Sequence, residues 1–361
     1  MTTDALPATP SAASRWILRG LTGGIITALP VVAIGLYFIG FAPNYYQHLA
    51  AAALVNLIIV VGLQVFMGNS GVPQLGHSAF VGLGAYGLAI LATPVALKKL
   101  SIPHAPFGLS QITLSPVIAI PISFVVVAVL ALVSGRIISR LSGVAATIVS
   151  LAFLVIVHSV FLHWPELFKG NQAFFGIPKI FGLPAIIAGA VAAIVIARLF
   201  RESATGLQLR ATADNLQAAE ALALDSRALR RRAWLLSALI CGAAGMLYAG
   251  FAGTISPKVF YFQQVFLTLA MLILGGMGTV TGAMLGTILL SFGLEAIRSV
   301  ETGVSVLGIQ MPAMLGLSGV ALGVVIVLCM ALRPQGISGR YELDEAIGAL
   351  LRRNSRMDKA E

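Results

Sequence analysis

Long apolar runs, separated by short polar segments, form the main pattern of this 361-residue chain. Most of the runs have about the 20 residues that a helix needs to cross the hydrocarbon core of a bilayer. The runs cover residues 17–40, 45–66, 78–97, 112–134, 141–163, 181–199, 233–253, 263–276, 281–297 and 310–332. The eighth and ninth are shorter, because 263–298 is long for one span and short for two. The pattern predicts an all-α polytopic membrane protein with about ten (8–10) transmembrane helices.

The composition agrees with this pattern and leaves little room for a soluble domain. Hydrophobic residues make up 58% of the chain and charged residues 10%, whereas a typical soluble domain is about 25% charged. We expect one transmembrane domain over residues 15–339, with a polar loop at 200–232 as its one large interruption. Residues 1–14 and 340–361 are expected to be flexible or interfacial tails on the cytoplasmic side.

The net charge of +10 indicates orientation in the membrane rather than a nucleic-acid partner. If the N-terminus lies inside, the polar segments place 17 of the 23 Lys and Arg residues on the inner side and six on the outer side. Inner loops of membrane proteins carry such an excess of positive charge. Ten crossings also keep the arginine-rich C-terminal tail inside, which favours two spans within 263–298. We expect a multi-pass protein with both termini cytoplasmic, surrounded by membrane lipid.

The loop between the sixth and seventh runs has the pattern of a short amphipathic helix. Asp214 precedes the helical pattern and Gln217 follows three residues later, which is a capping-box arrangement. Leu216 and Ala219 begin a small apolar face, and Asp225 is placed to cap the next helix. By shape alone, such a helix either lies on the membrane surface or contacts a partner.

Two glycine-rich stretches interrupt the apolar pattern. The first, "GNSGVPQLGH", covers residues 68–77, and the second, "GGMGTVTG", covers residues 275–282. Interrupted segments of this kind often mark the binding region of a transporter. The first stretch is either a break that lines the pathway or a polar turn between two full-length spans. The second is either a flexible break along the path or a place where helices pack closely through small residues.

Four stretches together resemble one protein family, in its order and spacing. They are "GNSGVPQLGHSAFVGLGAYG", "LQLRATADNLQAAEALALDSRALRRRAWLL", "LILGGMGTVTGAMLGTILL" and "LRPQGISG". The chain resembles the integral membrane permeases of branched-chain amino acid ABC importers, and in particular the longer of the two permease subunits. The resemblance extends over residues 62–339.

The resemblance implies a permease subunit in the bacterial cytoplasmic (inner) membrane that is not itself an enzyme. Two cytoplasmic ABC ATPase subunits would hydrolyse ATP, since the sequence contains no Gly-Lys-Ser/Thr phosphate-binding loop. A binding protein would deliver the substrate, and a second permease subunit would complete a heterodimer. The implied substrates are leucine, isoleucine and valine or related amino acids, with urea or short amides as the alternative. We expect no bound cofactor and no metal.

An ATP-independent carrier or channel is the less favoured alternative. Ion-coupled carriers usually place ionisable residues within their spans. Of the 13 acidic residues, Glu295 alone lies in a predicted span, near its end.

Two sets of functional residues follow from the resemblance. The expected translocation path or substrate contact comprises Gly68, Asn69, Ser70, Gly71, Gln74, Gly76, His77, Gly275, Gly276, Gly278 and Thr279. The expected contact with the ATPase, a cytoplasmic coupling helix, comprises Arg210, Ala218, Ala219, Glu220, Ala221, Leu222 and Asp225. The family usually has glycine where this chain has Ala223, and a left-handed alanine costs about 1 kcal/mol. We therefore expect this turn to be more helical than usual.

Overall fold

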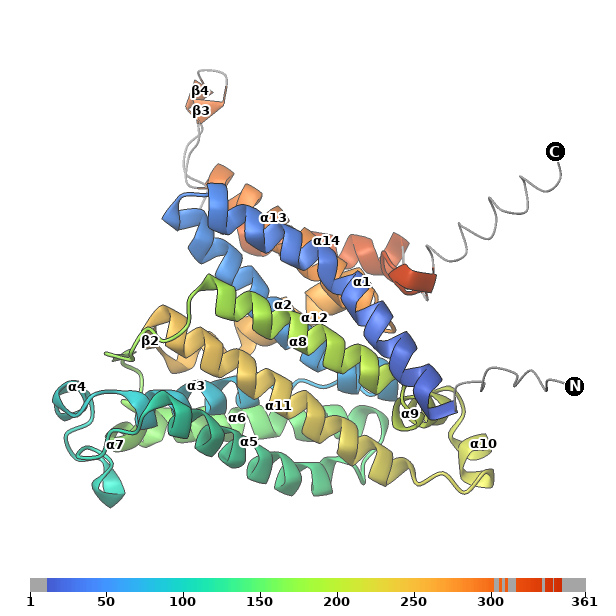
Figure 1. Ribbon diagram of the computed structural model, residues 1–361, viewed down its shortest axis with the longest axis horizontal. Helices are drawn as coiled ribbons and strands as arrows, with labels where there is room; N and C mark the ends of the chain where they lie inside the picture. The colour runs from blue at the N-terminus through green and yellow to red at the C-terminus, as the bar shows by residue number, and fades with distance from the viewer. Residues whose placement is uncertain are drawn as a thin grey trace, which may run out of the picture.

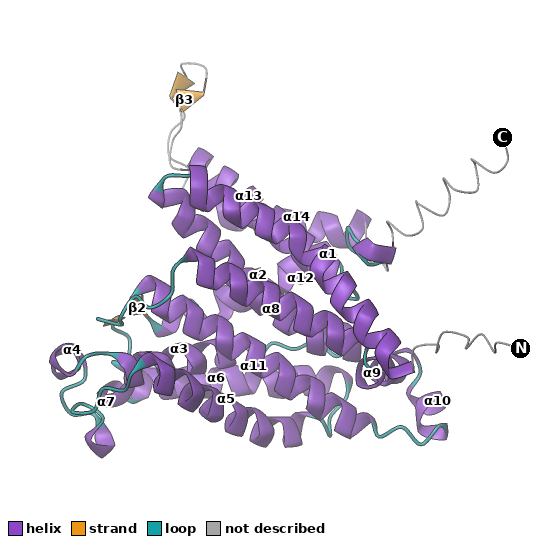
Figure 2. Cartoon of the chain, in the orientation of Figure 1, coloured by secondary structure: helices purple, strands orange, loops and turns teal. Residues whose placement is uncertain are grey.

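The computed structural model describes residues 12–301, 305–306, 309–310, 316–332, 335–339 and 341–345. Most of these residues are α-helical, and the strands form two short antiparallel pairs (Figure 2). The pairs are β1 (Phe174–Phe175) with β2 (Thr254–Ile255), and β3 (Ser305–Val306) with β4 (Ile309–Gln310). The predicted all-α polytopic fold is confirmed.

Eight helical segments of the described chain are long and apolar enough to cross a membrane. They are α1 (Ala12–Phe41), α2 (Asn44–Ser70), α5 (Pro116–Ile138), α6 (Gly143–His163), α8 (Leu183–Glu202), α11 (Ser226–Ala252), a segment made of η2 (Pro257–Phe260) and α12 (Phe262–Gly275), and α13 (Val280–Glu301). Two helices of 16 residues, α3 (His77–Ala92) and α14 (Leu317–Leu332), complete the expected order. The stretch 263–298 forms two helices, as the charge pattern favoured.

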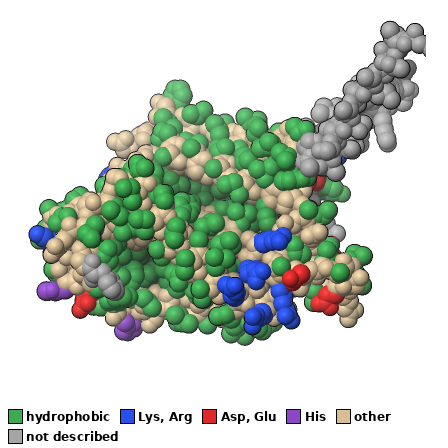
Figure 3. Space-filling view, turned by 60° about the horizontal axis from the view of Figure 1, so that its bottom comes forward, with side chains coloured by type: hydrophobic (Ala, Val, Ile, Leu, Met, Phe, Trp, Pro, Cys, Tyr) green, Lys and Arg blue, Asp and Glu red, His purple; other side chains and the backbone are tan. Residues whose placement is uncertain are grey.

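The long helices run between two ends of the molecule (Figure 1). One end carries α9 (Ala204–Asp214), α10 (Leu216–Ala221), the end of α8 and the start of α11. The opposite end carries α4 (Val95–Ser101), α7 (Pro165–Phe168) and the β1–β2 pair, and η1 (Pro106–Gly108) follows α4 in the chain. Most of the blue Lys and Arg side chains in Figure 3 gather at the first end, which we call the arginine-rich end. The charge asymmetry expected from the sequence is therefore present in the fold.

The centre of the bundle is α2, which packs against α8, α11 and α13. Close approach in this core depends on glycine. A Cβ atom on Gly84 of α3 would overlap the carbonyl oxygen of Gly242, and one on Gly245 of α11 would overlap that of Val81. The backbones of α3 and α11 therefore touch, as small residues allow between membrane helices.

The outer helices α5 and α6 present large apolar side chains to the surroundings. Val125 and Val129 on α5, and Ile148 and Ile156 on α6, are all exposed. An exposed apolar helix face is stable in hydrocarbon, where the helical backbone already satisfies its own hydrogen bonds. This side of the molecule is suited to lipid.

Candidate functional site

The first glycine-rich break is shorter than the sequence predicted. α2 continues to Ser70, and Gly71 ends it in a left-handed conformation (φ 67°), with its N–H donating to the carbonyl of Met67 at 3.0 Å. The non-helical segment is 71–76 rather than 68–77. Gly68, Asn69 and Ser70 are helical, and the amide Nδ2 of Asn69 donates to the carbonyl of Val65 at 3.0 Å.

Hydroxyl groups of neighbouring helices satisfy the backbone of this break. The amide of Leu75 donates to the Oγ of Ser150 at 3.1 Å, and the Oγ1 of Thr147 donates to the carbonyl of Pro73 at 3.1 Å. Gln74 is fully buried, and its Oε1 accepts a long hydrogen bond of 3.5 Å from Ser237 of α11. The break is thus packed against α6 and α11, and side chains of α6 satisfy part of its backbone.

His77 and Ser78, which begin α3, are hydrogen-bonded to the segment around the start of α12. The Nε2 of His77 lies 2.8 Å from the Oγ1 of Thr268, and the Oγ of Ser78 donates to the carbonyl of Phe260 at 2.9 Å. Both side chains are fully buried. In this structure His77 therefore connects two helices, while its expected role in the path stays a prediction.

The second break lies against the last turn of α2, just before the first break. α12 ends at Gly275, Gly276 has a φ of 117°, and α13 begins at Val280. A Cβ atom on Gly68 would overlap the carbonyl oxygen of Met277. The structure thus brings the two predicted glycine-rich stretches into contact at Gly68 and Met277.

The chain beyond α14 returns to cover this second break. The amides of Ile337 and Ser338 donate to the carbonyls of Leu274 and Gly275 at 3.0 and 2.9 Å. The Oγ1 of Thr279 donates to the Oγ of Ser338 at 3.2 Å. The final stretch of the family resemblance, "LRPQGISG", therefore includes residues that hold the end of α12.

A buried carboxylate, Glu342, completes this contact. It accepts hydrogen bonds from the amides of Val280 and Thr281, both at 3.0 Å, and from the hydroxyl of Thr281 at 2.6 Å. It also forms ion pairs with Arg198 at 3.0 Å and Arg201 at 3.3 Å. Burial by itself would raise the pKa of Glu342, but the two arginines and the hydrogen bonds outweigh it and hold the pKa below its usual range.

The prediction of a flexible or interfacial tail from residue 340 is therefore wrong for residues 341–345, and the tail from 346 lies outside the described residues. A carboxylate with two arginines and the positive start of α13 around it is stabilised where a free tail would not be. The sequence analysis missed Glu342 because a contact between residues so far apart leaves no local pattern. Its partners did leave a signal, since two arginines, Arg198 and Arg201, end an apolar run.

Arg210 connects α9 to the same group of charges. Its Nη2 donates to the carbonyl of Arg201 at 3.1 Å, and the Nε of Arg201 in turn donates to the carbonyl of Gly278 at 3.3 Å. Burial, with the positive charge of Arg201, lowers the pKa of Arg210. The side chain of Arg210 thus faces α8 and the second break.

The cap of α10 differs from the prediction by one residue. The Oδ1 of Asn215 accepts from the amide of Ala218 at 3.0 Å, whereas Asp214 is the last residue of α9. The predicted capping box at Asp214 is therefore wrong. Asn215 takes the role because its backbone is extended, as an N-cap requires.

The turn after α10 is left-handed despite its alanine. Ala223 has a φ of 57°. Its amide donates to the carbonyl of Glu220 at 2.9 Å, and the amide of Leu224 donates to that of Ala219 at 3.1 Å. These two bonds form a Schellman motif. They offset the cost of about 1 kcal/mol for a left-handed alanine, so the expectation of a more helical turn is wrong.

α10 projects from the arginine-rich end, beyond the helix bundle (Figure 1). Of the expected contact residues, Ala218, Glu220 and Ala221 are exposed, and Leu222 is 74% exposed. Ala219 is buried within the chain and is not available to a partner. Asp225 caps α11 as predicted, since its Oδ1 accepts from the amides of Arg227 and Ala228 at 3.0 and 3.1 Å.

The chain is similar in sequence to permease proteins of branched-chain amino acid transport systems. The chain is 28% identical to the high-affinity branched-chain amino acid transport system permease protein LivM of Escherichia coli, over 90% of this chain and 78% of LivM. Identity to LivM of Salmonella typhimurium is 27% over the same shares. LivH, a permease protein of the same E. coli system, is 26% identical over 43% of this chain and 46% of LivH.

No solved structure matches the chain. A family model described as "Branched-chain amino acid transport system / permease component" matches residues 45–330, a region that contains both broken segments and α9 to α11. The chain therefore belongs to this family of permeases.

Proposed function

We propose that this protein is a transmembrane permease subunit of an ATP-binding-cassette importer and forms part of the path for leucine, isoleucine and valine or related amino acids. The observation that carries this proposal is the family match over residues 45–330. Urea or a short amide is the alternative substrate, because Val72, Pro73 and Gln74 occupy a stretch where similar permeases commonly have Gln-x-Ser.

The proposed location is the bacterial inner membrane, with the arginine-rich end in the cytoplasm. The gathering of Lys and Arg at one end supports this orientation. Both termini would then be cytoplasmic, and the large loop with α9 and α10 would face the ATPases. This chain would bind no cofactor and hydrolyse no ATP.

The proposed partners are two ATPase subunits, a substrate-binding protein and a second, related permease. Similarity to both LivM and LivH of E. coli supports a pair of permeases with different sequences. The exposed residues of α10, and Leu222 above all, offer a surface to an ATPase.

The contacts described above suggest how closure of the ATPases would reach the path. Movement of α10 would displace α9, because a single residue, Asn215, separates the two helices. α9 is bonded through Arg210 to Arg201, and Arg201 is bonded to Gly278 and Glu342 at the second break. Opening to the cytoplasm would then separate Met277 from Gly68. ATP drives this step to the extent that it binds the closed ATPases more tightly than the open ones.

The test of this proposal is Leu222→Arg in the assembled transporter. Loss of a hot-spot residue from an interface costs about 2 kcal/mol or more, and the arginine also places a new charge against the partner. We expect a loss of about tenfold or more in co-purified ATPase and in ATP-driven leucine uptake into proteoliposomes.

The matched control is Leu207→Arg, which changes an exposed leucine of α9 at the same end. We expect it to leave both measurements within about twofold of wild type, as for a surface substitution outside an interface. Normal uptake and normal ATPase yield with Leu222→Arg would refute the docking assignment. Absence of ATP-driven uptake of any branched-chain amino acid by the wild-type complex would refute the proposed function.

A further inference from the structure

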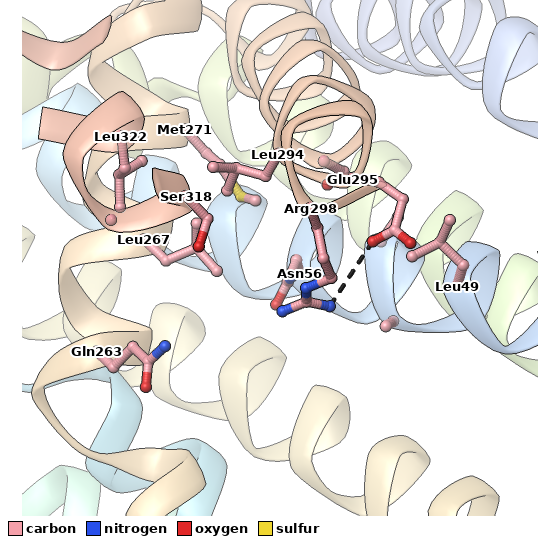
Figure 4. A pocket seen from close by; sticks show the side chains of 14 residues that line it. Leu49, Asn56, Gln263, Leu267, Met271, Leu294, Glu295, Arg298, Ser318 and Leu322 are labelled. Carbon is pink, nitrogen blue, oxygen red and sulfur yellow. Dashed lines mark ion pairs between the residues drawn. The ribbon is translucent and has the colours of Figure 1, made fainter. Parts of the chain in front are cut away.

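A cavity of about 270 Å³ lies between α2, α12, α13 and α14, away from the two breaks (Figure 4). Polar residues line it from four helices: Asn56 from α2, Gln263 from α12, Ser291, Glu295 and Arg298 from α13, and Ser318 from α14. The rest of the wall is largely apolar, with Leu267 and Met271 among its residues. An apolar wall with a few polar groups is typical of a small-molecule site.

Two further hollows continue this cavity along α2. Toward the opposite end, a hollow of about 600 Å³ shares Leu49, Glu295 and Arg298 with it. Deeper in the bundle, a hollow of about 200 Å³ shares Asn56. At the boundary, the Nε2 of Gln264 donates to the Oδ1 of Asn56 at 2.8 Å. The three hollows form a series that leads from the opposite end toward the middle of the molecule.

The charged side chains of the cavity are arranged as a pair. The Oε2 of Glu295 lies 3.6 Å from the Nη1 of Arg298, and its Oε1 accepts from the hydroxyl of Tyr45 at 2.8 Å. The side chain of Glu295 is 19% exposed and that of Arg298 is 67% exposed, so the guanidinium is accessible from outside the cavity.

The pair complements both charges of a free amino acid. The carboxylate of Glu295 can take the α-ammonium group, and the guanidinium of Arg298 can take the α-carboxylate through two parallel hydrogen bonds. The apolar side chains around Leu267 and Met271 can then contact an apolar substrate side chain. Urea and short amides carry neither charge and would form no ion pair with Glu295 or Arg298.

The helices that line the cavity also carry the two breaks. α2 bears Asn56 and, 12 residues further on, Gly68, which is about 18 Å at 1.5 Å per residue. α12 and α13 likewise run from the cavity to Gly275 and Val280. The three hollows include none of the predicted path residues, among which Gly68 lies against Met277 at the other end of α2. One set of helices thus combines a hollow at one end with a closed contact at the other.

We propose that this cavity is the outer binding site for the transported substrate, a zwitterionic α-amino acid with a branched apolar side chain. The proposal rests on the function proposed above and assigns its substrate class to Glu295 and Arg298. These residues are distinct from the glycine-rich stretches, which would act as the inner closure.

The test measures ATP-driven leucine uptake by the assembled transporter with its binding protein. Glu295→Gln retains an acceptor for the hydroxyl of Tyr45 and removes only the charge, so the contact between α2 and α13 is kept. Together with Arg298→Gln, it should lower uptake about tenfold or more, because the two variants remove both charges that would pair with the substrate. ATPase yield should be unchanged. The control is Glu166→Gln, at an exposed acid of α7, which should leave uptake within about twofold of wild type.

A second variant fills the cavity without altering any charge. Ala52 is exposed, lines two of the hollows, and can accept a larger side chain without disturbing the core. Ala52→Phe should block leucine uptake, and Ala152→Phe, on the exposed side of α6, should not.

Each outcome bears on one proposal. Leucine uptake within about twofold of wild type in Glu295→Gln, Arg298→Gln and Ala52→Phe would overturn the site while leaving the permease function intact. Loss of the second permease from the purified Ala52→Phe complex would also overturn it, by showing that the partner subunit fills the hollow. A wild-type complex that fails to transport leucine would instead refute the proposed function.

Discussion

The last turn of α2, just before the first break, contacts the second break, yet the two breaks are held in different ways. The first, 71–76, is bonded to neutral groups on the bundle helices α6 and α11, among them Ser150 and Thr147. The second, 276–279, is bonded to the C-terminal segment and to buried charges, with Glu342 and Arg201 at its centre. The first break is therefore fixed to the body of the bundle, whereas the second is connected through Arg210 to α9 and the exposed loop.

From this difference we infer that the two breaks behave differently in the conformational change of transport. A neutral hydrogen bond contributes about 0.5–1.5 kcal/mol, while loss of one partner from a buried ion pair costs about 3–5 kcal/mol. The ionic contact is strong, and it also gathers α8, α13 and the C-terminal segment into one unit. We expect the second break to move with this unit against a stationary first break.

The strongest test removes the charge at the centre of the second break. Glu342→Gln leaves Arg198 and Arg201 buried with one negative partner fewer, and should lower the free energy of unfolding by about 3 kcal/mol at neutral pH. Asp344→Asn, which removes a partly exposed partner of Arg198, is the control and should cost about 1 kcal/mol or less. Denaturant titration in mixed micelles measures both.

Wild type and Glu342→Gln can also be compared as a function of pH. The pKa of Glu342 in the folded protein lies below its ordinary value of 4.5. Its contribution to stability is therefore complete above that value and is lost as the pH falls through the lowered pKa. The difference between wild type and Glu342→Gln should shrink over this acid range. A difference that is constant with pH, or absent at neutral pH, would contradict the role of the charge.

A smaller effect is expected where the last turn of α2 meets the second break. Gly68→Ala places a methyl group against the carbonyl oxygen of Met277 and should cost about 1–3 kcal/mol, as overpacking does in a close-packed interior. It should also change leucine uptake, because the closed contact no longer fits. Gly278→Ala is the matched control, since nothing lies within 4 Å of the added atom. Equal stabilities for Gly68→Ala and Gly278→Ala would mean that Gly68 is not closely packed against Met277.

The smallest effect is expected at the first break. Ser150→Ala removes the acceptor of the amide of Leu75 and should cost about 1 kcal/mol, independent of acid pH. Ser159→Ala, on an exposed part of α6, should change stability by less than about 0.5 kcal/mol. If Ser150→Ala costs as much stability as Glu342→Gln, the neutral hydrogen bonds of the first break are as strong as the ionic contacts of the second, and the proposed difference is refuted.

Local patterns in the sequence predicted the helices and much of the loop. Apolar runs of about 20 residues identify spans because a bilayer sets their length, and Asp225 was identifiable as a cap because its partners are adjacent in the chain. Asp214 was misassigned because an acid and an asparagine stand side by side and backbone conformation selects between them. The left-handed Ala223 was missed because the two hydrogen bonds that stabilise it depend on where α10 ends.

The candidate site was predictable only in part. The two glycine-rich stretches were recognisable, but their contact at Gly68 and Met277 was not, since it joins residues far apart in the chain. Glu342 had been placed in a tail, and Glu295 had been noted only as an acid near the end of a span. Both acquire their significance from the side chains that surround them in the fold.

The sequence by itself determined the class of protein, the order of its helices, the polar loop and the family. These properties depend on composition, on periodicity and on short motifs, which are continuous along the chain. Only the tertiary structure decided that the last turn of α2 contacts the second break, that Glu342 and the arginines hold the second break, and that Asn56, Glu295 and Arg298 share a cavity. Such arrangements depend on which faces of distant helices pack together, and the burial and electrostatics of each charge follow from that packing.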